Sequence, residues 1–338
     1  MYSFDGSTAD QVWGRAAEVF RTRNGTASTT SRAGETGELL HASFTIREPR
    51  QRWVFSRVPA INPAFAIAEV FWILAGRNDA AFLTTWNRQL PQYAGTGPTF
   101  HGSYGHRLRA SAGFDQLAAA HQVLRERPDT RQVVLQIWEP TADFPHGDGS
   151  PRSADIPCNV CAVLKVRQNR LHWLQILRSN DLILGVPYNF VQFTSLQEIM
   201  AGWLGIEVGE YCHVADSLHI YHGDRDTLDS RQTFETGMNT DSLLLPKDQF
   251  DPLLNRVVET IERLGNSDTS RRAERDLLEN EWCPPAYRHL LLVVGAEAAR
   301  RRRDSGAADR LISLCDNPAL KAVWINWRRR LNSALEHS

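Results

Sequence analysis

The segment AFAIAEVFWILA at residues 64–75 constrains the fold of this 338-residue chain more than any other feature. A helix that is apolar on almost every side must be buried, and Gly76 directly after it is a natural helix stop. Residues 160–166 and 171–178 are two predicted strands joined by the short polar turn RQNR. Because no repeat or linker divides the chain, a buried helix beside paired strands indicates a single α+β domain over residues 1–338.

The rest of the pattern predicts further elements of both kinds. We expect helices at about 7–22, 110–125, 190–204 and 297–303 and from about Pro318, and strands at 39–47, 131–138 and 217–222. We expect loops at 24–38, 89–103 and 140–157, and the polar, acidic stretch 226–280 contains no sharp motif.

The charge balance excludes several classes of partner. The formal net charge is −1, so no global field attracts DNA or an anionic membrane, and an anionic ligand must be held by a local group of arginines. No stretch approaches the roughly 18 apolar residues of a membrane span, and residues 1–11 lack the regions of a signal peptide. Five cysteines are an odd count that argues against a disulfide scaffold. These features are typical of a cytoplasmic enzyme.

Cys158 follows Pro157 at the point where a long loop enters a predicted strand. A single cysteine is most often core filling, because unpaired cysteines are among the most buried residue types. Cys158 and Cys161 form a C-x-x-C pair, which could suggest metal or redox chemistry. We reject both interpretations, since no second pair has zinc spacing and a strand, not a helix N-terminus, follows.

The next segment, RSNDLILGVPYNFVQF at residues 178–193, strengthens the case for Cys158. A strand, a turn and a capped helix would explain Gly185 and Pro187. They would not explain Arg178, Asp181 and Asn189 together among apolar residues. Buried charges need partners, and a ligand is one such partner.

These residues resemble the hallmark of the thymidylate synthase family. That family carries a Pro-Cys nucleophile followed about 20 residues later by R-S-x-D-x-x-L-G-x-P-[FY]-N, and the run is complete here. The resemblance spans roughly residues 10–225, leaves 226–338 divergent, and implies a mixed β-sheet with flanking helices. Further matches are Glu69, Trp72 and Leu74 in E-x-x-W-x-L, Tyr104, Gly105 and Arg109 in Y-G-x-x-x-R, His219 and Tyr221 in H-x-Y, and the arginines Arg32 and Arg131.

The resemblance implies one-carbon transfer to C5 of a pyrimidine nucleoside monophosphate. Cys158 would add to C6 of the base, after which C5 attacks a carbon supplied by 5,10-methylenetetrahydrofolate. Arg178 would lie close to both the thiolate and the phosphate. Glu69 would organise water and proton transfers at the base, and Tyr104 would assist removal of the C5 proton.

The same resemblance assigns the binding residues. Arg32, Arg131 and Arg178 would clamp the phosphate, with Ser179 adding a hydroxyl. His219 and Tyr221 would bond the sugar 3′-hydroxyl, and relatives are homodimers in which Arg131 reaches the other subunit. Asp181 would hold the pterin ring, with Gly185 and Tyr188 also on the folate side. Asn189 would read the base edge, and a carboxamide suits uracil N3–H and O4, whereas relatives acting on cytidylates tend to carry aspartate.

The departures from the family lie on the folate side. Only Trp86 remains of a tryptophan-containing segment, Asn159 replaces a histidine, Gln132 replaces an arginine, and Ser217 replaces an acid. The chain ends in the charged WRRRLNSALEHS, where the family has an apolar closing tail. Since returning a hydride needs a dry, closed site, we favour a 5-hydroxymethyl product.

Four alternatives stay open at this stage. They are reductive methylation of dUMP by a thymidylate synthase, a cytidylate hydroxymethylase, an inactive nucleotide- or RNA-binding relative, and a cysteine hydrolase. The hydrolase would need a histidine and an orienting carboxamide near Cys158, and no sequence feature specifies them.

Overall fold

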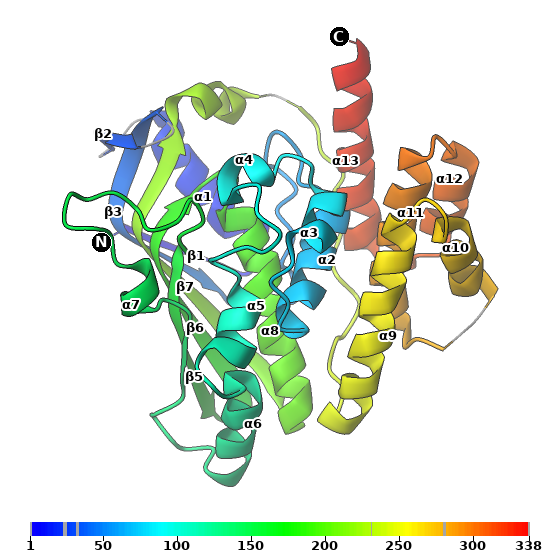
Figure 1. Ribbon diagram of the computed structural model, residues 1–338. Helices are drawn as coiled ribbons and strands as arrows, with labels where there is room; N and C mark the ends of the chain where they lie inside the picture. The colour runs from blue at the N-terminus through cyan, green and yellow to red at the C-terminus, as the bar shows by residue number, and fades with distance from the viewer. Residues whose placement is uncertain (1, 23–25, 32–33, 231, 280–281, 337–338) are drawn as a thin grey trace.

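The computed structural model describes residues 2–22, 26–31, 34–230, 232–279 and 282–336 (Figure 1). In these residues a seven-stranded mixed sheet has the order β1-β3-β7-β6-β5-β4, with β2 paired to β3. The pairs β1·β3 and β6·β7 are parallel and the others antiparallel, as expected for a mixed sheet. The strands are β1 (Tyr2–Gly6), β2 (Ala27–Ser31), β3 (Gly34–Ile46), β4 (Val134–Gln136), β5 (Asn159–Arg167), β6 (Arg170–Asp181) and β7 (Glu207–Tyr221).

Helices cover one face of this sheet and continue away from it in layers (Figure 1). α8 packs on β6 and β7, α2 packs on α8, and α9, α11 and α13 pack on the far side of α2. The helices are α1 (Ala9–Thr22), α2 (Pro63–Leu74), α3 (Ala80–Trp86), α4 (Pro91–Ala94), α5 (Tyr104–His106), α6 (Gln116–Glu126), α7 (Pro140–Asp143), α8 (Val186–Leu204), α9 (Lys247–Gly265), α10 (Ser270–Glu279), α11 (Pro285–Arg301), α12 (Ser305–Ser313) and α13 (Pro318–Glu336), with the π-helical segment η1 (Arg107–Ser111) and the 3₁₀ helix η2 (His222–Asp229).

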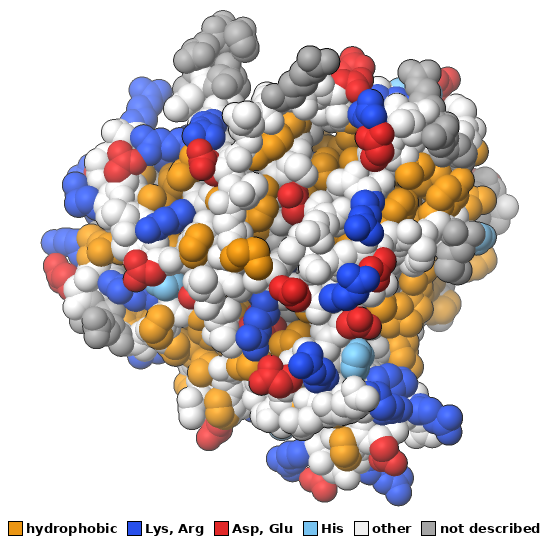
Figure 2. All heavy atoms as spheres, turned by 180° about the vertical axis from the view of Figure 1, so that it is seen from behind, with side chains coloured by type: hydrophobic (Ala, Val, Ile, Leu, Met, Phe, Trp, Pro, Cys, Tyr) orange, Lys and Arg blue, Asp and Glu red, His pale blue; other side chains and the backbone are white. Residues whose placement is uncertain are grey.

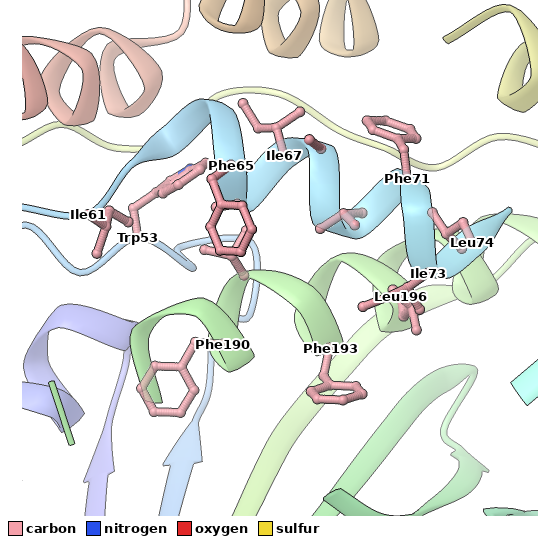
Figure 3. Packing of buried hydrophobic residues seen from close by; sticks show 14 of the residues in the cluster. Trp53, Ile61, Phe65, Ile67, Phe71, Ile73, Leu74, Phe190, Phe193 and Leu196 are labelled. Atoms are coloured by element: carbon pink, nitrogen blue, oxygen red, sulfur yellow. The ribbon is translucent and has the colours of Figure 1, made fainter. Parts of the chain in front are cut away.

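The position of α2 between two helical layers explains why its sequence is apolar on almost every side. Phe65 lies toward α8, with its ring 5.3 Å from Tyr188, whereas Phe71 lies on the other side, 6.3 Å from Tyr287 of α11 (Figure 3). The predicted buried helix is therefore confirmed. Burial of a large apolar side chain stabilises the fold by about 1.5–3 kcal/mol, so α2 is a central source of stability.

Several predicted boundaries were wrong. The expected loop 24–38 contains β2 and the start of β3. The expected strand 131–138 forms a strand only at Val134–Gln136, and the expected helix 110–125 begins at Gln116. The strand expected at 217–222 is the end of the 15-residue β7. Most of β7 was not predicted, because its buried face includes Gly209 and His213 and therefore lacks a simple alternation of apolar and polar residues. Similarly, the helix expected at 190–204 begins at Val186, and the helix expected at 297–303 is the end of α11.

The stretch 226–280 is mainly helical. In α9 the residues Phe250, Leu253, Leu254, Val257 and Ile261 are buried at helical spacing, a pattern hidden by the many charged residues between them. Single turns also form within the loops expected at 89–103 and 140–157, at α4 and α7. Among the described residues, no helix combines the length and apolar character that crossing a membrane requires.

Candidate active site

The backbone around Cys158 is fixed by the sheet. The residue precedes β5, is partly buried, and forms no disulfide. Its carbonyl accepts a hydrogen bond of 2.9 Å from the Arg178 N–H on β6. A β-bulge between Asn159 and Cys161 then shifts the register, a device that re-aims side chains. Cys161 lies beyond the bulge, and burial raises the pKa of its thiol.

Arg178 holds the loop that delivers Cys158. Its Nε donates to the Pro157 carbonyl at 3.0 Å and its Nη2 to the Ile156 carbonyl at 3.2 Å. The guanidinium also lies over the Trp138 ring, 5.4 Å from the centroid. The cation is therefore positioned beside the cysteine by contacts within the protein, while the residue remains exposed to a ligand.

Tyr104 meets Cys158 from a different element. Burial raises the pKa of the Tyr104 hydroxyl well above its usual range, with a further contribution from the nearby Cys158 and an opposing one from the Asn159 side chain. The following residue, Gly105, lies so close to α2 that an added Cβ would come within 2.6 Å of the Ile73 carbonyl oxygen. The absence of a side chain at Gly105 thus lets α5, which carries Tyr104, approach α2.

Glu69 lies on α2 with one carboxylate oxygen, Oε2, buried and without a hydrogen-bond partner in the described part of the chain. Burial raises the pKa of Glu69 to about 7, and a polar contact with Gln192 opposes this shift. The charge of Glu69 also contributes to the raised pKa of Tyr104, so the two groups are close. A carboxyl that titrates near neutral pH can hold or release a proton during a reaction.

Gln192 connects Glu69 to Asn189, and the motif did not identify it. Its Oε1 accepts a hydrogen bond of 2.9 Å from Asn189 Nδ2, so its own amide N–H groups are left to face Glu69. Both amides are buried on α8. The only signal available in the sequence was the i, i+3 spacing of Asn189 and Gln192, which places two carboxamides on one helix face.

One carboxylate oxygen of Asp181 takes part in a local turn. Its Oδ1 accepts hydrogen bonds from the N–H groups of Ile183 at 2.7 Å and Leu184 at 2.8 Å, while Oδ2 is buried without a partner in the described residues. Burial raises the pKa of this carboxyl. Gly185 closes the turn, and a Cβ there would come within 2.3 Å of Asn180 Oδ1, so its contribution is to the turn itself.

Three further predicted residues meet where β6 and β7 end. Ser179 Oγ lies 3.4 Å from His219 Nδ1, and the Tyr221 ring packs edge-on, 5.5 Å from the His219 ring. Tyr188, at the start of α8, accepts a hydrogen bond of 2.9 Å from the Asn62 N–H. Ser179, His219 and Tyr221 therefore lie at the same edge of the sheet as Asp181, which pairs with His219.

Of the predicted phosphate ligands, Arg131 is not brought to Cys158 within one chain. Arg32 lies outside the described residues. Arg131 is exposed and acts electrostatically on Lys165, whose pKa is lowered by burial first and then by Arg167 and Arg131. At about 3.3 Å per strand residue, Lys165 lies roughly 20 Å along β5 from Cys158.

Comparison with known proteins identifies the family of the chain. A family model described as thymidylate synthase matches residues 35–270, well over half of the chain. The chain belongs to the thymidylate synthase family. A protein named deoxyuridylate hydroxymethyltransferase from Bacillus phage SP01 is 33% identical over 270 residues, which cover 75% of this chain and 68% of that protein.

Other relatives carry two different names. A deoxyuridylate hydroxymethyltransferase of Pseudomonas phage M6 is 35% identical over 175 residues, 51% of this chain and 48% of that protein. A thymidylate synthase of Symbiobacterium thermophilum is 32% identical over 187 residues, 50% of this chain and 62% of that protein. This chain thus spans about half to two thirds of its relatives' lengths.

Trp86, the remaining tryptophan of the segment that departs from the family, is 1% exposed. Its ring lies 5.3 Å from the Arg301 guanidinium, and its carbonyl accepts a hydrogen bond of 2.7 Å from Arg301 Nη2. It therefore packs against the C-terminal helices and offers no aromatic surface to a ligand.

Asn159, which stands in place of the family's histidine, is fully buried, and its Oδ1 accepts a hydrogen bond from Gln175 Nε2 at 3.0 Å.

Proposed function

We propose that this protein transfers a hydroxymethyl group to C5 of a uridylate through a covalent adduct on Cys158. The observation that carries the proposal is the convergence of Cys158, Tyr104 and Glu69 from three separate elements. Relatives named deoxyuridylate hydroxymethyltransferase support the same activity.

The nucleotide chemistry needs a nucleophile, an acid–base group and a base-reading amide. Addition of the Cys158 thiolate to C6 moves the electron pair of the C5–C6 double bond toward O4 and makes C5 nucleophilic. Glu69, with its pKa of about 7 and its unpaired Oε2, can exchange a proton with water or the base. Tyr104, whose pKa is raised by burial and by the charge of Cys158, would guide removal of the C5 proton.

Asn189 supports uracil as the base. Because Gln192 accepts one N–H of the Asn189 amide, the orientation of this amide is fixed by its partner. The remaining Oδ1 and N–H can then accept from uracil N3–H and donate to O4. Cytosine presents the reverse pattern, and an amide held in this orientation would leave polar groups unpaired against it.

The residues present fit a reduced folate. Asp181 Oδ2 is a buried acceptor without a partner, which suits the N–H groups of a pterin ring. When bound, 5,10-methylenetetrahydrofolate supplies a carbon at the oxidation level of formaldehyde. Asp181 would hold the pterin, the turn closed by Gly185 would keep Asp181 in place, and Tyr188 would flank the ring system.

The buried Trp86 supports hydroxymethylation over methylation. Return of a hydride to the methylene group on C5 needs a site closed to water. With the Trp86 indole packed against Arg301, no ring from this residue shields C5, and water can add to the methylene instead. The product would then gain CH₂O.

We further propose that the protein is a homodimer joined through the open face of the sheet. The open sheet face is the side without helices, where Val163, Leu174, Ile176 and Val214 are only partly buried and Val134 is 49% exposed. Register places Val134 beside Val163, Val163 beside Leu174, and Ile176 beside Val214. Hydrophobic side chains gather on the sheet side of the molecule in Figure 2. A second copy would cover this face and could bring Arg131 to the other site.

Exchange of the C5 proton tests the covalent step. The wild-type protein should release tritium from C5-labelled dUMP, and Cys158→Ala should abolish release while leaving nucleotide affinity within about tenfold. Cys161→Ala is the matched control, because it alters the other cysteine of the pair beyond the bulge. Tritium release by Cys158→Ala would overturn the proposal.

A further inference from the structure

Asp155 is a second carboxylate in the neighbourhood of the proposed nucleophile. It lies on the loop that leads into β5, three residues before Cys158, and it is partly buried. Its Oδ2 accepts a hydrogen bond of 2.7 Å from the Gly102 N–H. The chemistry proposed above leaves this carboxylate without a role.

Close backbone packing fixes the place of Asp155. An added Cβ at Gly102 would come within 2.9 Å of the Asp155 carbonyl oxygen and 3.1 Å of the Pro157 nitrogen, so a side chain there would force the two segments apart. The Arg178 guanidinium donates to the next two carbonyls of the loop. The segment from Asp155 to Cys158 is therefore tied both to Gly102 and to Arg178, which holds the carboxylate at a fixed place relative to the thiol.

Tyr104 connects Asp155 to the reacting part of the site. Burial first, and then the charge of Cys158, raise the pKa of the Tyr104 hydroxyl, and Asp155 contributes more to this shift than Glu69 does. Since the interaction between charges falls with distance, Asp155 belongs to the group of residues around Tyr104 and Cys158. Tyr104 would guide removal of the C5 proton, so Asp155 would lie on the side of the base where C5 reacts.

A buried hydroxyl in the same segment calls for a water molecule. Ser103 is 3% exposed, and its Oγ has no hydrogen-bond partner within the described residues. It lies between Gly102, which bonds to Asp155, and Tyr104. Buried hydroxyls of this kind are ordinarily satisfied by an ordered water. The segment that holds the Asp155 carboxylate therefore also carries a ligand for a water.

The two carboxylates that act on Tyr104 differ in their surroundings. Glu69 lies on α2 and contacts Gln192, which in turn bonds to Asn189. These contacts associate Glu69 with the edge of the base that Asn189 would read. Asp155 comes instead from the loop of the nucleophile, a position that suits a reaction at the carbon attached to C5.

We propose that Asp155 is the general base that activates the water in hydroxymethylation. The inference rests on the proposed function and names the residue that completes it. After carbon transfer, a methylene group is joined to C5 by a double bond. The water oxygen bonds to this methylene carbon, one proton of the water passes to the Asp155 carboxylate, and the electron pair of the double bond moves to O4. The enolate then re-forms the C4 carbonyl and the C5–C6 double bond and expels the Cys158 thiolate.

Product analysis of Asp155→Asn with and without 2-mercaptoethanol tests this role. A thiolate can add to the methylene without a base, whereas water needs one. The variant should form the hydroxymethyl nucleotide about a hundredfold more slowly than wild type, because a general base is lost. It should keep C5 proton exchange and dUMP affinity within about threefold of wild type. With added thiol it should form the corresponding thioether of the nucleotide at close to the wild-type turnover.

Asp148→Asn is the matched control, because Asp148 is exposed on the same loop and accepts hydrogen bonds from Ser150. Formate should restore hydroxymethyl product to Asp155→Ala by supplying a carboxylate, which a purely structural role would not allow. Thermal melting of each variant verifies its fold.

Two results would overturn the role of Asp155. One is formation of the hydroxymethyl nucleotide by Asp155→Asn at the wild-type rate, and the other is an equal loss of the hydroxymethyl and thioether products. A wild-type product that has gained CH₂ would instead refute the proposed function itself. An unaffected Asp155→Asn, beside a wild type that forms the hydroxymethyl nucleotide, would refute the base alone.

Discussion

Replacing Glu69 by Gln should stabilise the protein at alkaline pH while impairing catalysis. Burial raises the pKa of Glu69 from 4.5 to about 7, so the folded state holds a proton that the unfolded state has released between these values. The stability from this proton is fully present below pH 4.5 and is lost as pH rises through about 7. At 1.36 kcal/mol per pKa unit, the loss is about 3 kcal/mol at pH 8.

Urea unfolding of wild type and Glu69→Gln at pH 5 and pH 8 measures this loss. The difference in unfolding free energy between the two proteins should grow by about 2.5 kcal/mol from pH 5 to pH 8, in favour of the variant. Comparing two pH values removes any effect of the amide itself. Glu126→Gln, at an exposed helix end, should show no such growth. An identical difference at both pH values would refute the raised pKa and the role of Glu69 as a proton store.

Three further predictions follow from the same contacts. Gln192→Leu should raise the apparent pKa assigned to Glu69 in the pH profile of kcat/KM by up to about one unit, because a contact that favours the ionised carboxylate is lost. Ser195→Ala, one turn along α8, should leave this apparent pKa unchanged. An unchanged apparent pKa in Gln192→Leu would exclude the contact. Asn189→Asp should shift preference from uridylate toward cytidylate in competition assays read by kcat/KM, and an unchanged ratio would show that Asn189 does not decide the base. Ile176→Asp should convert a dimer to a monomer in light scattering, because it places a charge in the open sheet face; a wild-type monomer would remove the cross-subunit role of Arg131.

The sequence predicted the parts of the fold that depend on local pattern. The run 64–75 could be recognised as a buried helix because α2 is apolar at every position except Glu69. The β5–β6 hairpin could be recognised because two apolar runs flank a short polar turn. β7 was mostly missed, since its buried face contains Gly209 and His213, whose burial depends on strands distant in sequence. In α9 the charged residues concealed a regular apolar stripe.

Some of the site residues could be predicted from the sequence and others could not. The grouping of Cys158, Tyr104 and Glu69 was expected only from family resemblance, because the three residues come from elements far apart in the chain. Gln192 was missed because its importance depends on contacts with Asn189 and Glu69 that no spacing rule specifies.

The mass of the nucleotide product tests the central claim most directly. The protein is incubated with dUMP and 5,10-methylenetetrahydrofolate, and the nucleotide is analysed by mass spectrometry while the folate product is followed by absorbance. The account predicts a product that has gained CH₂O, with tetrahydrofolate released and no product from Cys158→Ala. A nucleotide that has gained CH₂, with dihydrofolate formed in equal amount, would contradict hydroxymethylation and show that the site returns a hydride despite the buried Trp86.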